Sequence, residues 1–217
     1  MSHFVIYVFQ KANGKDLEDM LAPYDENLEV TPYIRYTKEQ IIELEKKDIN
    51  NFNNNFYSKY LENPNKYIKE HEDNEYHLNF IKKFPERLTW TDEECYNHYV
   101  DTWFDRESID EDGNYWSEYN PNSKWDWYQI GGRWSNILAL KNGNEVDEDY
   151  VSEVDFDKTM TPFAFIDTEG RWHEKGEMGW WCTTNNEKTE EDWERIFKYY
   201  LRTLNGDEII TVVDCHI

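Results

Sequence analysis

The chain has 217 residues and a formal net charge of −23, and aromatic residues make up 17% of it. So many rings argue against a disordered chain, and the length suffices for a sizeable core. The acidic excess argues against direct nucleic-acid binding, which needs clustered Lys and Arg to neutralise phosphates. The three cysteines are isolated and show no CxxC spacing, so we expect a cytoplasmic protein. No apolar run is long enough to span a membrane, so we expect no membrane contact.

The N-terminal segment predicts a buried strand followed by a short helix. Residues 4–9 are apolar throughout and either β-branched or aromatic, which is typical of a central strand. Residues 15–21 fit a short helix that ends at or before Pro23.

A mainly helical insertion is predicted over residues 37–119. Thr37 has capping-box spacing and begins a helix over 38–60, although a run of asparagines weakens its middle. A looser amphipathic pattern follows over 66–84, and a second capping box opens at Thr91. This block is rich in Lys and Asn, and its sequence gives no chemical signal of its own.

The C-terminal third has the clearest pattern. Residues 163–174 predict a β-hairpin, and the helix capped by Thr189 carries apolar residues at i, i+3, i+4, i+7, i+8 and i+11. Residues 209–213 predict a buried terminal strand. Together these elements predict a single α+β domain over 1–217, with an antiparallel or mixed sheet of ferredoxin-like elements and helices packed on it.

The main candidate site is the segment Trp125–Trp134, which holds aromatics, a carboxylate, a glycine pair and a guanidinium within ten residues. Glycines permit close backbone approach, Arg133 offers a planar fork of donors to an anion, and tryptophans offer flat walls. We expect a second segment, Gly176–Trp181, to face it. The predicted ligand-binding residues are Trp125, Asp126, Trp127, Gly131, Gly132, Arg133, Trp134, Met178, Trp180 and Trp181. The alternative is a tryptophan-rich core in which Asp126 and Arg133 form an internal ion pair.

A second hypothesis concerns catalysis, and whether the chain is an enzyme stays open. Imidazole and carboxylate groups can bind a divalent metal or act as general acid and base. The candidate residues are His173, Glu174, Glu177, Asp214 and His216. No HExxH or comparable spacing supports them, so we expect neither a metal nor a cofactor.

A third hypothesis uses the acidic surface. Residues 89–160 hold 18 acidic and 5 basic residues, which include the acidic stretches 101–112 and 145–157. Carboxylates spread over one face could imitate the phosphate spacing of a duplex and occupy a basic host protein. The ordinary alternative is that such runs are solvated loops that maintain solubility.

Several segments resemble a family of proteins encoded in tailed bacteriophages and prophages that carries no assigned activity. The segments that carry this resemblance are 21–27, 125–134, 176–181 and 211–217. The resemblance covers chiefly 1–36 and 120–217 and does not extend to 37–119. It implies a phage accessory protein made in a bacterial host cytoplasm, where such proteins often interfere with host machinery or defence.

The favoured function is therefore binding of a small anionic, nucleotide-like ligand in a Trp/Arg pocket, which would interfere with a host defence or regulatory pathway. The first alternative is an acidic inhibitor of a host nucleic-acid-binding protein. The second is a metal-dependent hydrolase that uses His173, Asp214 and His216.

Overall fold

The computed structural model describes residues 2–178 and 184–217 and divides the chain into two compact units. The first unit comprises Met1–Val30 and Tyr119–Ile217, and the second comprises Thr31–Glu118. The second unit nearly coincides in range with the predicted helical insertion, 37–119.

The first unit is built from strands and a few helices. Its strands are β1 (His3–Gln10), β4 (Trp127–Ile130), β5 (Leu138–Ala139), β6 (Glu145–Val146), β7 (Glu148–Tyr150), β8 (Ala164–Ile166), β9 (Trp172–Glu174), β10 (Glu177–Met178), β11 (Thr184–Asn185) and β12 (Ile209–His216). Its helices are α1 (Leu17–Leu21) and α7 (Glu190–Leu201), with the short 3-10 turns η1 (Ala22–Tyr24), η5 (Gly132–Trp134) and η6 (Val151–Glu153).

A mixed six-stranded sheet forms the centre of this unit. Its strand order is β4-β12-β1-β8-β9, and β7 also pairs with β12. Strand β1 runs antiparallel to β12 from His3↔His216 to Gln10↔Ile209, and parallel to β8 through Ile6↔Ala164. The sheet and its helices confirm the predicted α+β fold, and the parallel contact makes the sheet mixed.

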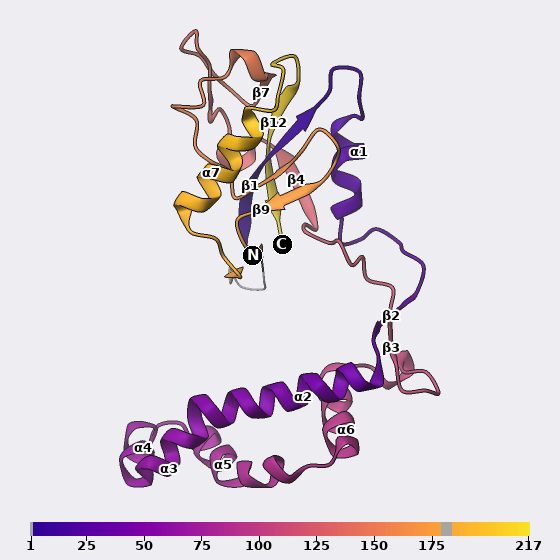
Figure 1. Ribbon diagram of the computed structural model, residues 1–217, viewed down its shortest axis with the longest axis vertical. Helices are drawn as coiled ribbons and strands as arrows, with labels where there is room; N and C mark the ends of the chain where they lie inside the picture. Colours follow the sequence, from indigo (N-terminus) through magenta and orange to yellow (C-terminus); the bar gives the residue numbers. More distant parts are fainter. Residues whose placement is uncertain (1, 179–183) are drawn as a thin grey trace. The chain divides into compact units, whose positions relative to one another are not determined.

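Both faces of this sheet are covered (Figure 1). Helix α7 packs on the face that carries Tyr7, Phe9 and Val212, while α1 packs on the face that carries Ile6 and Val213. Side chains alternate between the two faces along each strand, so the continuous apolar runs of β1 and β12 supply both cores at once.

Helix α7 follows its predicted pattern closely. The Thr189 hydroxyl caps it by accepting a hydrogen bond from the backbone N–H of Asp192, and Trp193 and Phe197 are buried. The Trp193 indole N–H donates to the carbonyl of Pro162 at 2.7 Å. Because this polar atom is satisfied, the large ring can be buried without an unpaired donor.

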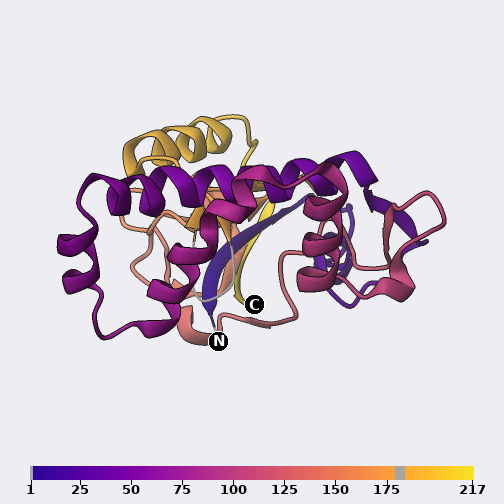
Figure 2. The ribbon, with the colours of Figure 1, turned by 90° about the horizontal axis from the view of Figure 1, so that it is seen from below.

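The second unit is mainly helical. It contains β2 (Tyr33–Tyr36), α2 (Lys38–Phe52), the π-helical segment η2 (Asn53–Tyr57), α3 (Ser58–Glu62), α4 (Pro64–Glu70), α5 (Glu75–Lys83), the 3-10 helix η3 (Phe84–Thr89), α6 (Asp92–Trp103), η4 (Arg106–Ser108) and β3 (Tyr115–Ser117). Helix α2 runs the length of the unit, with α6 packed on it near one end (Figure 2).

Both predicted capping boxes, at Thr37 and Thr91, are present. The predicted helix over 38–60 continues to Glu62, and its asparagine-rich middle adopts π geometry. At the end of this segment the Ser58 hydroxyl donates to the carbonyl of Asn53 at 2.9 Å, five residues earlier.

Backbone pairing corrects one expectation and adds one contact that the sequence did not predict. The segment 145–157, expected to be an acidic loop, contains β6, β7 and η6, and Thr211 pairs with Glu148 in the main sheet. Strands β2 and β3 pair with each other within the second unit although Tyr33 and Ser117 are far apart in sequence. Local periodicity carries no information on such distant partners.

Candidate functional site

The predicted segment Trp125–Trp134 forms strand β4, at one edge of the main sheet, and the turn η5. The glycine pair makes this turn possible, because Gly131 and Gly132 have φ values of 68° and 53°. Side chains other than glycine rarely adopt this left-handed region. The N–H of Gly131 donates to the carbonyl of Val212 at 2.9 Å, which attaches the turn to β12.

Gly132 lies directly against the buried side chain of Asp214. A Cβ atom at Gly132 would lie 2.5 Å from both Cβ and Oδ2 of Asp214, a distance that real atoms do not tolerate. This approach allows the Arg133 backbone N–H to donate to Asp214 Oδ2 at 2.9 Å. The glycine pair thus allows a close approach, and the group that approaches it is the Asp214 carboxylate of the same chain.

The tryptophans of this segment do not line one pocket. Trp125 is 6% exposed and packs in the α1-side core, whereas Trp127 is 44% exposed and stacks on His216 on the opposite face. Trp134 is partly buried against the α7-side core. Trp125 precedes β4, which begins at Trp127, so the two rings do not follow the strand rule that places residues i and i+2 on one face. The sequence spacing alone did not reveal this separation.

Arg133 and Asp126 have separate surroundings. Asp126 Oδ1 lies 2.5 Å from His216 Nδ1, so the carboxylate is engaged by an imidazole and not by Arg133. The Arg133 side chain is exposed, and within residues 2–178 and 184–217 no carboxylate forms an ion pair with it. The described residues do not enclose the guanidinium.

The second predicted segment follows strand β9, which lies at the edge of the sheet opposite β4. Met178 belongs to β10, which pairs with β11 through Met178↔Thr184. Trp180 and Trp181 lie outside the described residues. The hypothesis that they face Arg133 therefore stays a prediction.

The structure does not bring the proposed catalytic residues together. Asp214 and His216 lie on β12 and His173 on β9, with β1 and β8 between them, a separation of about 14 Å from strand spacing alone. Glu177 lies on β10, where its carboxylate accepts from the Asn186 side chain. A hydrolase site that combines His173 with His216 does not form in this arrangement.

His173 belongs instead to a local cluster around Asp167. Its Nε2 lies 2.8 Å from Asp167 Oδ2, which also accepts from Arg171 Nε at 2.8 Å. Burial would raise the pKa of the Asp167 carboxyl, but the hydrogen bonds from His173 and Arg171 outweigh burial and lower it. The cluster holds the β8–β9 turn in place.

Some carboxylates of the acidic stretches form hydrogen bonds or ion pairs with other residues of the chain. Asp110 accepts hydrogen bonds from the Trp116 indole and from Asn114, and these bonds lower the pKa of its carboxyl to about 2. Asp155 pairs with Lys158 at 2.7 Å. These contacts favour the ordinary interpretation for these two carboxylates, while the duplex-mimic hypothesis stays a prediction.

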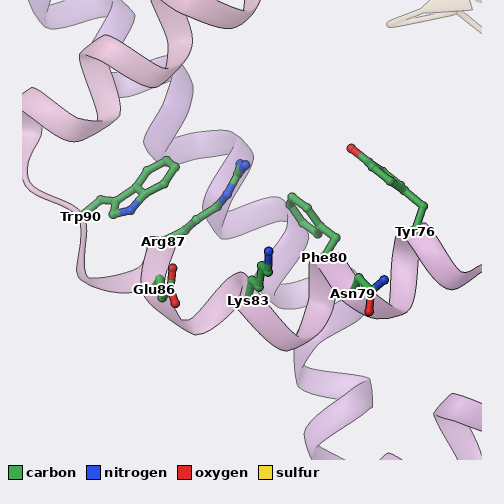
Figure 3. A pocket seen from close by; sticks show the side chains of 7 residues that line it. All are labelled: Tyr76, Asn79, Phe80, Lys83, Glu86, Arg87 and Trp90. Carbon is green, nitrogen blue, oxygen red and sulfur yellow. The ribbon is translucent and has the colours of Figure 1, made fainter.

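One of several similar pockets lies in the second unit, which was expected to give no chemical signal. Its volume is about 360 Å³ (Figure 3). Seven residues line it: Tyr76, Asn79, Phe80, Lys83, Glu86, Arg87 and Trp90. Tyr76 and Phe80 lie one helical turn apart on α5, and Pro85 then directs the chain into η3, which places Arg87 and Trp90 beside them.

Arg87 is held between two aromatic rings. Its guanidinium carbon lies 4.7 Å from the centre of the Phe80 ring and 4.9 Å from that of Trp90. Figure 3 shows the guanidinium lying between the two side chains. Stacking of this kind stabilises the cation and fixes its plane, while its N–H groups remain free to bind in that plane.

A buried carboxylate, that of Glu45, lies close to Arg87. Glu45 is 2% exposed, and its carboxylate lies 3.8 Å from Arg87 Nη1 and 3.1 Å from His98 Nδ1. Arg87 Nη2 lies 3.0 Å from His98 Nε2. Because arginine only donates, His98 Nε2 must accept, so the proton of the neutral ring is on Nδ1. Nδ1 lies 3.1 Å from the Glu45 carboxylate but forms no hydrogen bond with any described residue, so Glu45 is a close neighbour of the Arg87–His98 pair.

Sequence reasoning missed this pocket because its residues follow no recognised spacing. The three residues that make the stack come from different elements. Phe80 lies on α5, Arg87 lies in η3, and Trp90 directly precedes the cap of α6. The one available signal was an arginine and a lysine among aromatics between two helices. That pattern is common on ordinary helix surfaces.

No protein-family model, curated protein or solved structure matches this chain. None of the helices in the described part is both long enough and apolar enough to cross a membrane.

Proposed function

We propose that the chain binds a small, flat ligand that carries an anionic group, and that the ligand occupies the pocket around Arg87. The ligand class is the one expected from the sequence, a nucleotide-like anion recognised by tryptophan and arginine, but the residues differ. The observation that supports the proposal is the guanidinium of Arg87, stacked between Phe80 and Trp90 at the wall of a pocket of about 360 Å³.

The pocket offers two kinds of contact to such a ligand. Tyr76, Phe80 and Trp90 offer ring faces and edges on which a base can stack. Arg87 retains donors, because its guanidinium has five N–H groups and one of them is used by His98 at 3.0 Å. Lys83 adds a second cation to the pocket wall; the nearby carboxylates are Glu86 in the wall and the buried Glu45, 3.8 Å from Arg87 Nη1.

The net charge of −23 favours a small anionic ligand over a nucleic-acid strand. A nucleic-acid strand would bring many phosphates near an acidic surface, whereas one or two phosphates interact mainly with the nearest charges. At physiological ionic strength, charges beyond about 8 Å are largely screened. The local pair of cations can therefore bind a small anion in spite of the acidic chain.

The test is a binding measurement with AMP, adenosine and inorganic phosphate as probes. We expect AMP to bind more tightly than either fragment, because it alone uses the rings and the cations together. Arg87→Ala should weaken AMP binding by about 10- to 100-fold, which corresponds to the loss of a hydrogen bond to a charged group. Isothermal titration calorimetry measures the affinities.

Matched variants separate the pocket from general charge. Arg106→Ala removes an exposed arginine of the same unit that pairs with Asp101 at 2.7 Å and does not line the pocket, so AMP binding should be unchanged. Trp90→Leu should weaken AMP more than phosphate. Equal AMP affinity in wild type and Arg87→Ala, or no binding of any probe, would refute the proposal.

The biological setting is a further proposal that depends on the resemblance to phage accessory proteins. If the ligand is a host nucleotide, the chain would act by sequestering it and so weaken a host defence or regulatory pathway. A survey by mass spectrometry of small molecules that co-purify with the chain from infected bacteria would test this setting separately from the pocket.

A further inference from the structure

Two imidazoles face each other across the central strands β1 and β12. His3 pairs with His216, and the neighbouring pair Ser2 and Ile217 exchanges both backbone hydrogen bonds, at 3.2 and 3.1 Å. His3 and His216 therefore occupy a non-hydrogen-bonded position, at which side chains approach most closely. Their ring centres lie 5.0 Å apart, with the ring planes at 75°.

Each imidazole is oriented by its own carboxylate. His3 Nδ1 lies 2.9 Å from Asp214 Oδ1, and His216 Nδ1 lies 2.5 Å from Asp126 Oδ1. A carboxylate accepts, so each Nδ1 carries a proton and donates it. The lone pair of each neutral ring is then on Nε2, which is the arrangement found where histidine binds a metal.

The Nε2 atom of His216 has no partner among the described residues. It is buried, the whole side chain is 6% exposed, and no hydrogen bond satisfies the atom. A buried acceptor without a donor costs stability unless another group occupies the position. The stacked indole of Trp127, 5.1 Å from the His216 ring, covers the imidazole but offers no ligand atom to it.

We propose that His3 and His216 bind one divalent transition-metal ion of the zinc type through their Nε2 atoms. Two imidazoles that share one ion at ordinary zinc–nitrogen distances have ring centres about 5 Å apart, which agrees with the observed 5.0 Å. Two carboxylates and two neutral imidazoles leave a charge of −2, which a divalent cation balances. Imidazole ligands favour zinc, copper or nickel over magnesium or calcium.

The chain supplies only part of a coordination shell at this site. Within the part of the chain that the structure describes, no group of three or more His, Cys, Asp or Glu side chains forms a complete metal-binding set. The chain would therefore supply two ligands and water the others, with Asp214 and Asp126 as outer partners that fix the rings. We expect weaker binding than at a four-ligand structural zinc site.

Zn²⁺ titration of the full chain by calorimetry tests the proposal, with excess Mg²⁺ present to occupy the acidic surface. The wild type should bind one Zn²⁺ per chain, and Co²⁺ in its place should give visible absorption bands of a nitrogen-ligated ion. His3→Gln and His216→Gln should each lower the affinity about tenfold or more. His3→Gln alters the less buried ring, so it decides the question if His216→Gln does not fold.

The matched control is His173→Gln. His173 also lies against a carboxylate, 2.8 Å from Asp167, but it stands on β9 without a second imidazole opposite it. This variant should bind Zn²⁺ as the wild type does. If His3→Gln and His216→Gln bind Zn²⁺ as tightly as wild type, or if Mg²⁺ abolishes all Zn²⁺ binding, the proposal is wrong. Neither result affects the AMP proposal, which concerns residues of the other unit.

Discussion

Replacement of Gly132 by alanine should destabilise the first unit far more than an equivalent change at Gly143. Both glycines have positive φ values, 53° and 89°. The left-handed backbone conformation therefore makes alanine less favourable than glycine by about 1–2 kcal/mol at either position. The two sites differ in what the new methyl group meets.

At Gly143 the methyl group meets no atom within 4 Å, so the conformational cost is the whole effect. At Gly132 it would lie 2.5 Å from Asp214, on a central strand that cannot move freely. Forcing a group into a packed position costs about 1–3 kcal/mol more, so we expect about 2–5 kcal/mol in total for Gly132→Ala. The displaced carboxylate would also lose its bonds to Arg133 and His3.

Urea denaturation followed by tryptophan fluorescence, together with thermal unfolding, measures the difference. For a chain of this size each kcal/mol lowers the melting temperature by about 2–4 °C, so the two variants should be clearly separated. Equal destabilisation by Gly132→Ala and Gly143→Ala would show that Asp214 does not lie against the glycine pair. It would also remove the structural reason given for Gly132.

Two further predictions concern a core indole and a surface carboxylate. Trp193→Phe should cost about 1–3 kcal/mol, because it leaves the buried carbonyl of Pro162 without its donor, while Trp193→Ala, which also removes the ring, should cost about 3–5 kcal/mol. Chemical denaturation measures both, and a Trp193→Phe variant as stable as wild type would contradict the hydrogen bond. The lowered pKa of Asp110 means that its contacts persist above the ordinary value of 3.8 and are lost as the pH falls through about 2. The indole N–H resonance of Trp116 should therefore titrate with a pKa near 2, and a midpoint near 3.8 would show that the bond to Asp110 is absent.

The amino-acid sequence alone determined the elements whose signals are local. The apolar runs at 4–9 and 209–213 are strands, the caps at Thr37, Thr91 and Thr189 begin helices, and the hairpin over 163–174 forms. Each depends on residues within a few positions of one another, where periodicity, caps and turns act. The glycine pair was expected to admit a backbone or a ligand, and the group that lies against it is the side chain of Asp214.

Contacts between distant segments were decided only by the tertiary structure. The parallel pairing of β1 with β8 joins residues about 160 positions apart, and the separation of Trp125 from Trp127 follows from which sheet face each ring occupies. The opposition of His3 and His216 depends on strand register, and the stacking of Arg87 depends on the path of η3. Such contacts result from packing among many side chains, which local pattern does not encode.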